Sequence, residues 1–454
     1  MSFSDELARS LRLNRVTRRQ ALWLIGAGTL GVATPSLQGC ATSPVTGETI
    51  LVGMSEGQER RIDAEVSPHQ FSQDMGAIQD GAVNDYVSGV GRSIHTLSHR
   101  PKMPYSYRVL NANYINAYTF PGGAMGVTRG ILTELDDEAE LAALLGHEIG
   151  HVNARHAAQR QGQALIAQVA LVGIAIAAKD SKWETVAGIG GVIGASALLA
   201  SYSRDNEREA DALGQEYMVR SGYPATGMIQ LHQMLVDQEK HAPSLLETMF
   251  ASHPMSTERR NTARQLAETR YAASKGASPQ RERFMDNIAS LRRLKPTIDE
   301  CKQGETALAA KKYTKAEEYF RSALKRTPAD YPANLRMAQC LQAQNKNSEA
   351  RKYAAKASEV YPQEAQAHKL LGVLSLSMRE PGAAYDALDQ FDRLLPGDPG
   401  VVFLKGIALE GMGNRPRAAA QFQQYLGITQ QGEAAQYATE RLTSWGYIKT
   451  PPAK

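Results

Sequence analysis

The sequence predicts a mainly α-helical region with a small β-sheet (an α+β fold) over residues 57–296, followed by an all-α solenoid over residues 297–447. Three observations favour this division. Apolar residues of the first region recur mostly at three- and four-residue steps, as in helices, and one short stretch alternates as strands do. A pattern H-E-x-x-H lies at residues 147–151. From residue 297 onward, small residues return every 34 positions.

Length and charge exclude one class of protein. The chain has 454 residues, enough for roughly two or three domains with buried cores. Its net charge is +4, but residues 1–39 contain five arginines against Asp5 and Glu6, a net +3. The remaining chain is therefore close to neutral and lacks the basic surface of a nucleic-acid-binding protein. We expect no nucleic-acid partner.

Residues 1–39 have the features of an export signal. The arginines precede an apolar run of 13 residues, Ala21–Ala33, which suits a signal sequence and is too short to span a bilayer. Thr17–Leu22 resembles a twin-arginine motif, and Leu37–Cys40 resembles the lipobox of bacterial lipoproteins. The alternative is an uncleaved N-terminal anchor helix with an incidental cysteine.

The resemblance to a lipobox implies a location. Cys40 would carry the lipid and become the mature N-terminus, so that the chain is anchored to a membrane with its body in the periplasm. The next residue is Ala41 rather than aspartate, which by the same resemblance implies retention at the outer membrane. Residues 40–56 are then an extended polar tether.

The next hundred residues predict two kinds of element. The pattern is helical from about 56 to 97, and residues 105–110 alternate as a strand does. Residues 115–128 contain a Pro-Gly-Gly turn at 121–123, which predicts a β-hairpin. Acidic residues at 136–138 favour the start of the helix that carries the H-E-x-x-H pattern.

Two apolar runs, 164–178 and 186–200, follow that helix. Each has 15 residues, fewer than the roughly 20 that a membrane-spanning helix needs. One interpretation is a buried or lid-forming helical hairpin. The other is a hairpin that dips into the bilayer surface near the tether.

The H-E-x-x-H pattern points to a metal site. His147 and His151 are four residues apart, so one face of a helix presents both imidazoles to a single Zn²⁺. Glu148 follows His147 directly, next to the open position of such a metal, where a general base takes a proton from water. Alone, the pattern is also compatible with an amphipathic helix that carries two incidental histidines.

A second helix supplies the third ligand that the site requires. Glu207 follows His151 by 56 residues, and Asp211 lies one turn further on the same helical face. Glu207 would complete a His₂Glu site, which leaves a fourth position open. Asp211 would hydrogen-bond a ligand histidine and fix its tautomer. By itself, such a pair of carboxylates is more often a solvated helix face.

Together these motifs resemble the gluzincin endopeptidase family that includes HtpX and the CaaX prenyl protease. Further positions carry the same resemblance: Asn116-Ala117-Tyr118, Pro121-Gly122-Gly123, Arg155-His156, Ser203-Arg204, Ser252-His253-Pro254 and Arg259. Full-length transmembrane helices are absent from the sequence, so the branch of periplasmic lipoproteins with helical repeats is the better match. The resemblance implies a zincin-type fold for the catalytic region.

The resemblance also implies roles for individual residues. His253 would be a regulatory fourth ligand or an oxyanion contact, and Arg259 would stabilise the tetrahedral intermediate. A capped helix start is the plainer interpretation of both. An extended peptide would pair along the hairpin edge, at the positions Asn116, Ala117, Tyr118, Gly122 and Gly123. His156 lies off the ligand face and is expected to be structural.

The 34-residue period after residue 297 is that of tetratricopeptide repeats. One register position holds Ala316, Ala350, Ala384 and Ala418; another holds Gly304, Ala338, Gly372 and Gly406; prolines close three units at 328, 362 and 396. Small residues at fixed positions let the two helices of a unit approach closely. Such arrays bind peptides or partner helices on a concave face, so we expect a module that recruits protein substrates.

Cys301 and Cys340 fall in the first helices of adjacent repeats. A disulfide between them is one possibility in an oxidising periplasm, and two buried apolar thiols are the other.

The resemblance implies a zinc endopeptidase that cleaves misfolded or misassembled outer-membrane proteins in the bacterial envelope, with the outer-membrane assembly machinery as a candidate partner of the repeats. A chaperone or scaffold with a latent metal site is the alternative.

Overall fold

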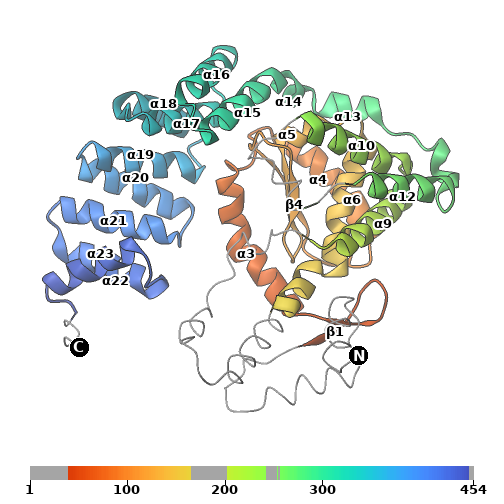
Figure 1. Cartoon of the computed structure of the whole chain (residues 1–454), viewed down its shortest axis with the longest axis horizontal. Helices are drawn as coiled ribbons and strands as arrows, with labels where there is room; N and C mark the ends of the chain where they lie inside the picture. The colour runs from red at the N-terminus through yellow and green to blue at the C-terminus, as the bar shows by residue number, and fades with distance from the viewer. Residues whose placement is uncertain (1–38, 165–201, 242–252, 254–255, 449–454) are drawn as a thin grey trace.

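The computed structural model describes residues 39–164, 202–241, 253 and 256–448 (Figure 1). The predicted export signal and the two apolar runs lie outside these residues, apart from residues 39 and 164. No helix in the described ranges combines the length and the apolar character that a membrane crossing requires.

Residues 40–54 differ from the extended tether that the sequence predicts. Strand β1 (Cys40–Thr42) pairs antiparallel with β2 (Thr49–Leu51). Val52 and Met54 are buried in a cluster that includes Phe120. The segment is therefore part of the folded domain, because its alternate apolar side chains find a place against the hairpin.

Two helices precede the sheet. Helix α3 (Glu56–Gln73) begins with a capping box between Ser55 and Gln58, and α4 (Gly81–His95) begins at the N-cap Asp80. Four apolar residues of α4 enter the main core, at the three- and four-residue steps seen in the sequence: Val83, Val87, Val90 and Ile94. The predicted helical stretch is thus two helices with a break at residues 74–80.

The central sheet has the strand order β3-β5-β4. The strands are β3 (Ser106–Leu110), β4 (Ala117–Thr119) and β5 (Ala124–Thr128). β3 runs parallel to β5, while β4 and β5 form the predicted antiparallel hairpin. Strand β4 is consequently one of the two edges of this sheet among the described residues.

Helix α6 (Glu138–Ala154) is buried along its whole length beside the sheet. Its N-cap is Asp137, and it ends at Arg155, whose left-handed backbone (φ 59°) stops the helix. Helices α9 (Arg204–Arg220) and α10 (Thr226–His241) pack against it, and α12 (Thr257–Glu268) packs against α9 and α10 (Figure 1). Shorter elements complete the domain: α5 (Arg129–Leu132), η1 (Ala272–Gly276), α13 (Arg281–Asn287) and α14 (Ala289–Arg293).

The C-terminal region is the predicted helical array. Its helices are α15 (Lys295–Ala309), α16 (Tyr313–Arg326), α17 (Tyr331–Ala343), α18 (Asn347–Val360), α19 (Ala365–Ser377), α20 (Pro381–Leu394), α21 (Pro399–Gly411), α22 (Arg415–Ile428) and α23 (Glu433–Ser444). Within a unit, a small residue of the first helix packs against a larger residue of the second helix, as Gly406 does against Phe422. Cys301 and Cys340 are both buried and not joined to each other.

The repeats pack against the catalytic region, which the sequence does not predict. The guanidinium of Arg129 lies 2.6 Å from the carboxylate of Asp330, and both side chains are buried. The Ser72 hydroxyl donates to Glu364 over 2.5 Å at the C-terminal end of α3. In Figure 1, α3 lies on the side of the catalytic region that faces the repeats. The first repeats are therefore fixed to the domain that carries the metal motif.

Candidate metal centre

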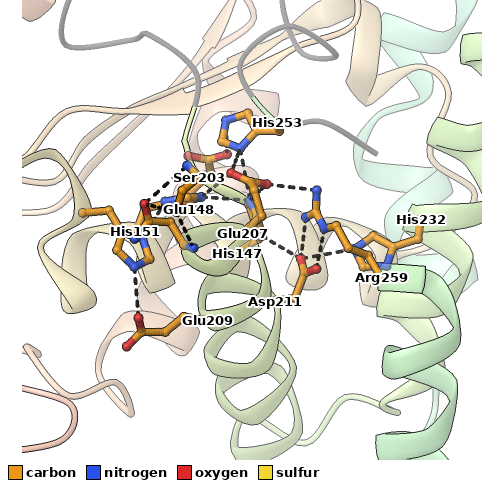
Figure 2. A network of polar contacts seen from close by, with 12 residues as sticks. His147, Glu148, His151, Ser203, Glu207, Glu209, Asp211, His232, His253 and Arg259 are labelled. Carbon is orange, nitrogen blue, oxygen red and sulfur yellow. Dashed lines mark hydrogen bonds and ion pairs between the residues drawn. The ribbon is translucent and has the colours of Figure 1, made fainter. Parts of the chain in front are cut away.

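Helices α6 and α9 bring the predicted ligands together. The Nε2 atoms of His147 and His151 are 3.1 Å apart. The carboxylate of Glu207 lies 3.6 Å from His147 Nε2 and 3.4 Å from His151 Nε2. Glu207 is in the first turn of α9, which is N-capped by Ser203. Figure 2 shows the three side chains converging on one point.

His253 joins this group from the other side. Its Nδ1 lies 3.0 Å from Glu207 Oε1 and 3.3 Å from His147 Nε2. One ligand atom from each of His147, His151, Glu207 and His253 falls within 4.8 Å of the others, and all four residues are buried. This arrangement could hold a metal ion, and it brings His253 to the three predicted ligands.

Asp211 contacts the predicted ligand His147 on the side of its ring away from the cluster centre. It accepts a hydrogen bond from His147 Nδ1 over 2.9 Å, and the guanidinium of Arg259 approaches it at 2.6 and 2.7 Å. Burial opposes ionisation, but the charges of His232 and Arg259 outweigh it and hold the pKa of Asp211 well below its usual range. An ionised Asp211 only accepts hydrogen bonds, so His147 carries its proton on Nδ1 and presents a lone pair at Nε2.

Glu207 is ionised for related reasons. Burial raises its pKa, but the charge of His253 and hydrogen bonds with His151 and His253 lower the pKa further than burial raises it. The guanidinium of Arg259 also lies 2.9 Å from Glu207 Oε2. Arg259 thus contacts two carboxylates of α9, Glu207 and Asp211. Its contact with the tetrahedral intermediate stays a prediction.

Glu148 differs from its neighbours. It is fully buried, and neither carboxylate oxygen has a hydrogen-bond partner among the described residues. His253 Nε2 lies 3.8 Å from Glu148 Oε1. Burial raises the pKa of Glu148 above its usual value. A carboxylate of raised pKa beside a metal cluster is suited to receive a proton.

The helices meet closely because small residues line their contact. A Cβ atom on Gly150 of α6 would lie 2.8 Å from the carbonyl oxygen of Ala210 on α9. This approach leaves no room for a larger residue at Gly150. It brings the first turn of α9 to the ligand face of α6.

The hairpin residues of the predicted substrate site have mixed roles. Gly122 donates its N–H to Asp63 over 2.7 Å, and Gly123 has φ 100°, as a tight turn requires. The Tyr118 hydroxyl donates to Asp74 over 2.5 Å. These contacts hold the hairpin in place. Asn116 directly precedes the edge strand β4, and Ala117 begins it. For all five residues, contact with substrate stays a prediction.

Three further residues lie near the cluster, and only His156 has a role expected from the sequence, a structural one. His232 on α10 lies 3.2 Å from Asp211, Tyr202 stacks on His151 with ring centroids 4.0 Å apart, and His156 contacts His151 at 2.9 Å. Only His156 belongs to a motif, and it is indeed outside the four-residue cluster. His232 and Tyr202 stand alone in the sequence, so no spacing pattern identifies them.

Comparison with known proteins agrees with this geometry. Residues 82–267 match the model of peptidase family M48, and residues 307–374 match a tetratricopeptide repeat model. The β-barrel assembly-enhancing protease of Yersinia pestis is 30% identical over 226 residues, which cover 48% of this chain and 46% of that protein. Its counterpart in Escherichia coli strain K12 is 28% identical over 250 residues, covering 54% and 51%.

A more distant relative is the human mitochondrial metalloendopeptidase OMA1, 28% identical over 183 residues that cover 38% of this chain and 35% of that protein. The chain thus spans about half, or less, of the length of these relatives. The matches confirm the predicted family and the predicted fold class. The chain therefore contains a domain of peptidase family M48, over residues 82–267, which tetratricopeptide repeats follow.

Proposed function

We propose that this protein is a zinc-dependent endopeptidase of the bacterial cell envelope that hydrolyses misfolded or misassembled outer-membrane proteins. One observation carries the proposal: three predicted ligands from two helices converge beside Glu148, a buried carboxylate with no hydrogen-bond partner among the described residues. A structural carboxylate in such a place would have a partner. A general base that awaits water and substrate does not need one.

The donor set favours zinc. Two imidazoles and one carboxylate from separate helices are the His₂Glu set of catalytic zinc sites. With zinc–ligand bonds of about 2.0–2.2 Å, tetrahedral donors lie roughly 3.3–3.6 Å apart. The distances of 3.1, 3.4 and 3.6 Å among His147, His151 and Glu207 are close to this range. His147 also presents an unprotonated Nε2 to the centre.

Each residue of the site would have its own role in the reaction. His147, His151 and Glu207 would hold the zinc ion, which supplies Lewis acidity toward a peptide carbonyl and toward water. Glu148 takes the proton of the attacking water and returns it to the leaving amine. Arg259 holds Glu207 and Asp211 in place, and through them the ligand geometry. His253 leaves the fourth position or contacts the developing oxyanion.

The edge strand β4 offers a place for substrate. Its partner β5 occupies one side only, so an extended peptide could pair with the other side through main-chain hydrogen bonds. Asn116, at the start of this strand, has a buried side-chain oxygen with no partner among the described residues. A peptide N–H would satisfy this oxygen. Such pairing reads little of the side-chain sequence, which suits a protease that acts on many misfolded chains.

Location and recruitment rest on further arguments. The names of the two bacterial relatives refer to β-barrel assembly, which takes place in the envelope. Cys40 is exposed. A lipid attached to it would anchor the protein to the outer membrane. The repeats would recruit protein substrates, and the outer-membrane assembly machinery is a candidate partner for their free face.

The alternative is a chaperone or scaffold with a latent metal site. It is favoured by the burial of all the site residues and by His253 at the fourth position. In this case the protein would hold envelope proteins and rarely cut them. Of the two functions, only the protease function requires Glu148 as a general base.

Replacement of Glu148 by Gln separates them. The variant keeps the shape of the side chain and all metal ligands, so zinc content measured by atomic emission should stay near one ion per chain. Casein cleavage by the purified protein should fall by orders of magnitude, and the variant should not relieve an envelope-stress phenotype in cells that lack the protein. Full casein cleavage and full relief by Glu148→Gln would exclude the protease function.

A further inference from the structure

His156 contacts a metal ligand although it lies outside the metal cluster. Its Nδ1 is 2.9 Å from Nδ1 of His151, and the planes of the two rings are inclined at 73°. The side chain is completely buried. On a continuous helix, residue 156 would be rotated by roughly 140° from His151. The left-handed Arg155 ends α6 and redirects the chain, so the ring of His156 turns back onto His151.

Glu209 lies on the far side of His156. Its Oε2 is 3.2 Å from His156 Nε2. Glu209 is on α9, two residues beyond the ligand Glu207. The three side chains form a hydrogen-bonded row in the order His151, His156 and Glu209.

The order of the row determines where the protons lie. An ionised carboxylate only accepts hydrogen bonds, so Glu209 selects the form of His156 with its proton on Nε2. The Nδ1 of His156 is then an acceptor, and the bond between the two imidazoles requires the proton on His151 Nδ1. Nε2 of His151 is left with a lone pair, and this is the atom that faces His147 and Glu207.

Tyr202 fixes the same ring in a second way. It stacks on His151 with ring centroids 4.0 Å apart and an interplanar angle of 24°. The guanidinium of Arg160 lies over Tyr202 at 4.7 Å from its ring centre. Stacking sets the plane of the His151 ring, and His156 sets its rotation within that plane. Each histidine of the H-E-x-x-H pattern therefore has its own hydrogen-bond partner at Nδ1. Asp211 is the partner of His147, and His156 is the partner of His151.

We propose that His156 is a positioning residue for the metal centre: oriented by Glu209, it accepts a hydrogen bond from His151 Nδ1 and so holds the zinc-binding tautomer of His151. The proposal rests on the zinc site of the proposed function. Residues of this kind typically contribute 10- to 100-fold in metal affinity. Because Glu209 is partly exposed, its contribution is expected to be smaller than that of His156.

The test measures zinc affinity of the full chain by competition with a chromophoric chelator at fixed pH. His156→Leu fills the site without an acceptor and should weaken zinc binding by about 10- to 100-fold. His156→Asn places an amide oxygen near the position of Nδ1 and should recover most of this affinity. Glu209→Gln keeps an acceptor for His156 and should bind zinc more tightly than Glu209→Ala.

Equal zinc affinity of the wild-type chain and a folded His156→Leu variant would overturn the proposal, as would equal losses in His156→Leu and His156→Asn. If His156→Leu does not fold, the comparison of Glu209→Gln with Glu209→Ala decides: equal affinities refute the proposal. A wild-type chain that binds no zinc would instead refute the proposed function, so the two failures are distinguishable.

Discussion

Gly146 on α6 and Gly214 on α9 meet backbone to backbone where the two helices cross. A Cβ atom on Gly214 would lie 2.6 Å from the His147 nitrogen, and one on Gly146 would lie 2.8 Å from the Gly214 carbonyl oxygen. Real Cβ atoms do not approach other atoms this closely. Since α6 carries two of the predicted ligands and α9 carries Glu207, the distance between the helices and the geometry of the metal centre are set by the same contact.

Replacement of Gly214 by Ala should therefore damage the metal site as well as the fold. The added methyl group forces α9 away from α6, and overpacking of this kind costs about 1–3 kcal/mol of stability. We expect a lower melting temperature and weaker zinc binding, both measured on the same purified variant. Gly427→Ala is the matched control, because a Cβ atom there meets no other atom within 4 Å. Unchanged zinc affinity in Gly214→Ala would contradict this account.

His253→Ala should increase proteolysis. The substitution removes the side chain at the fourth position and leaves His147, His151 and Glu207 to hold the ion, as in catalytic zinc sites that keep a position open. Zinc content should remain near one ion per chain, and the rate of casein cleavage should rise severalfold. His368→Ala, in the repeats, controls for the loss of a histidine elsewhere. A loss of casein cleavage with zinc retained would instead assign His253 to the reaction.

Much of the site follows from local patterns in the sequence. The four-residue step from His147 to His151 places both on one helical face, and the same step relates Glu207 to Asp211. The hairpin follows from its turn residues, and the repeat register follows from the 34-residue period. The helix and turn signals depend on residues close together in the chain, and the repeat signal depends on recurrence at a fixed spacing.

Other features depend on contacts that no local pattern encodes. The pair Arg129–Asp330 joins positions 201 residues apart, and neither residue is unusual in its own segment. His156 reaches His151 only because Arg155 adopts a left-handed backbone, which is uncommon for a residue with a side chain. The packing of the first repeats against the catalytic domain, and the position of His156 beside a ligand, therefore require the structure.

The Arg129–Asp330 pair should contribute strongly to the contact between the two domains. The side chains are only 2% and 3% exposed, so Arg129→Met leaves a buried carboxylate without its charged partner, which typically costs about 3–5 kcal/mol. We expect a lower melting temperature by differential scanning fluorimetry. Arg129→Met combined with Asp330→Asn removes both charges and should recover part of the loss.

Arg351→Met provides the comparison for this ion pair. Arg351 and Glu380 are each 43% exposed, and exposed pairs contribute about 0–1 kcal/mol. The variant should melt close to the wild-type temperature. If Arg129→Met melts as high as Arg351→Met does, the buried pair does not stabilise the contact between the domains.

The stability of the helix that carries the ligands should depend on pH through Glu140. This residue is buried in the first turn of α6, and its carboxylate accepts the N–H of Asp136 over 2.6 Å. Burial, with the nearby charges of Asp137 and Asp136, raises the pKa of Glu140 from its ordinary value of 4.5 to about 7. Its contribution to stability is therefore complete below pH 4.5 and is lost as the pH rises to about 7.

Glu140→Gln should remove this dependence, because the amide oxygen still accepts the N–H of Asp136 and the side chain cannot ionise. The variant should gain stability over the wild-type chain between pH 4.5 and 7, by at most about 3 kcal/mol, and the difference should stay constant at higher pH. Melting temperatures of the variant and the wild-type chain at about pH 5, 6, 7 and 8 test this prediction. Glu318→Gln, at an exposed position of α16, is measured over the same pH range as the control for the loss of one glutamate. A pH-independent difference between Glu140→Gln and the wild-type chain would show that burial of Glu140 carries no electrostatic cost.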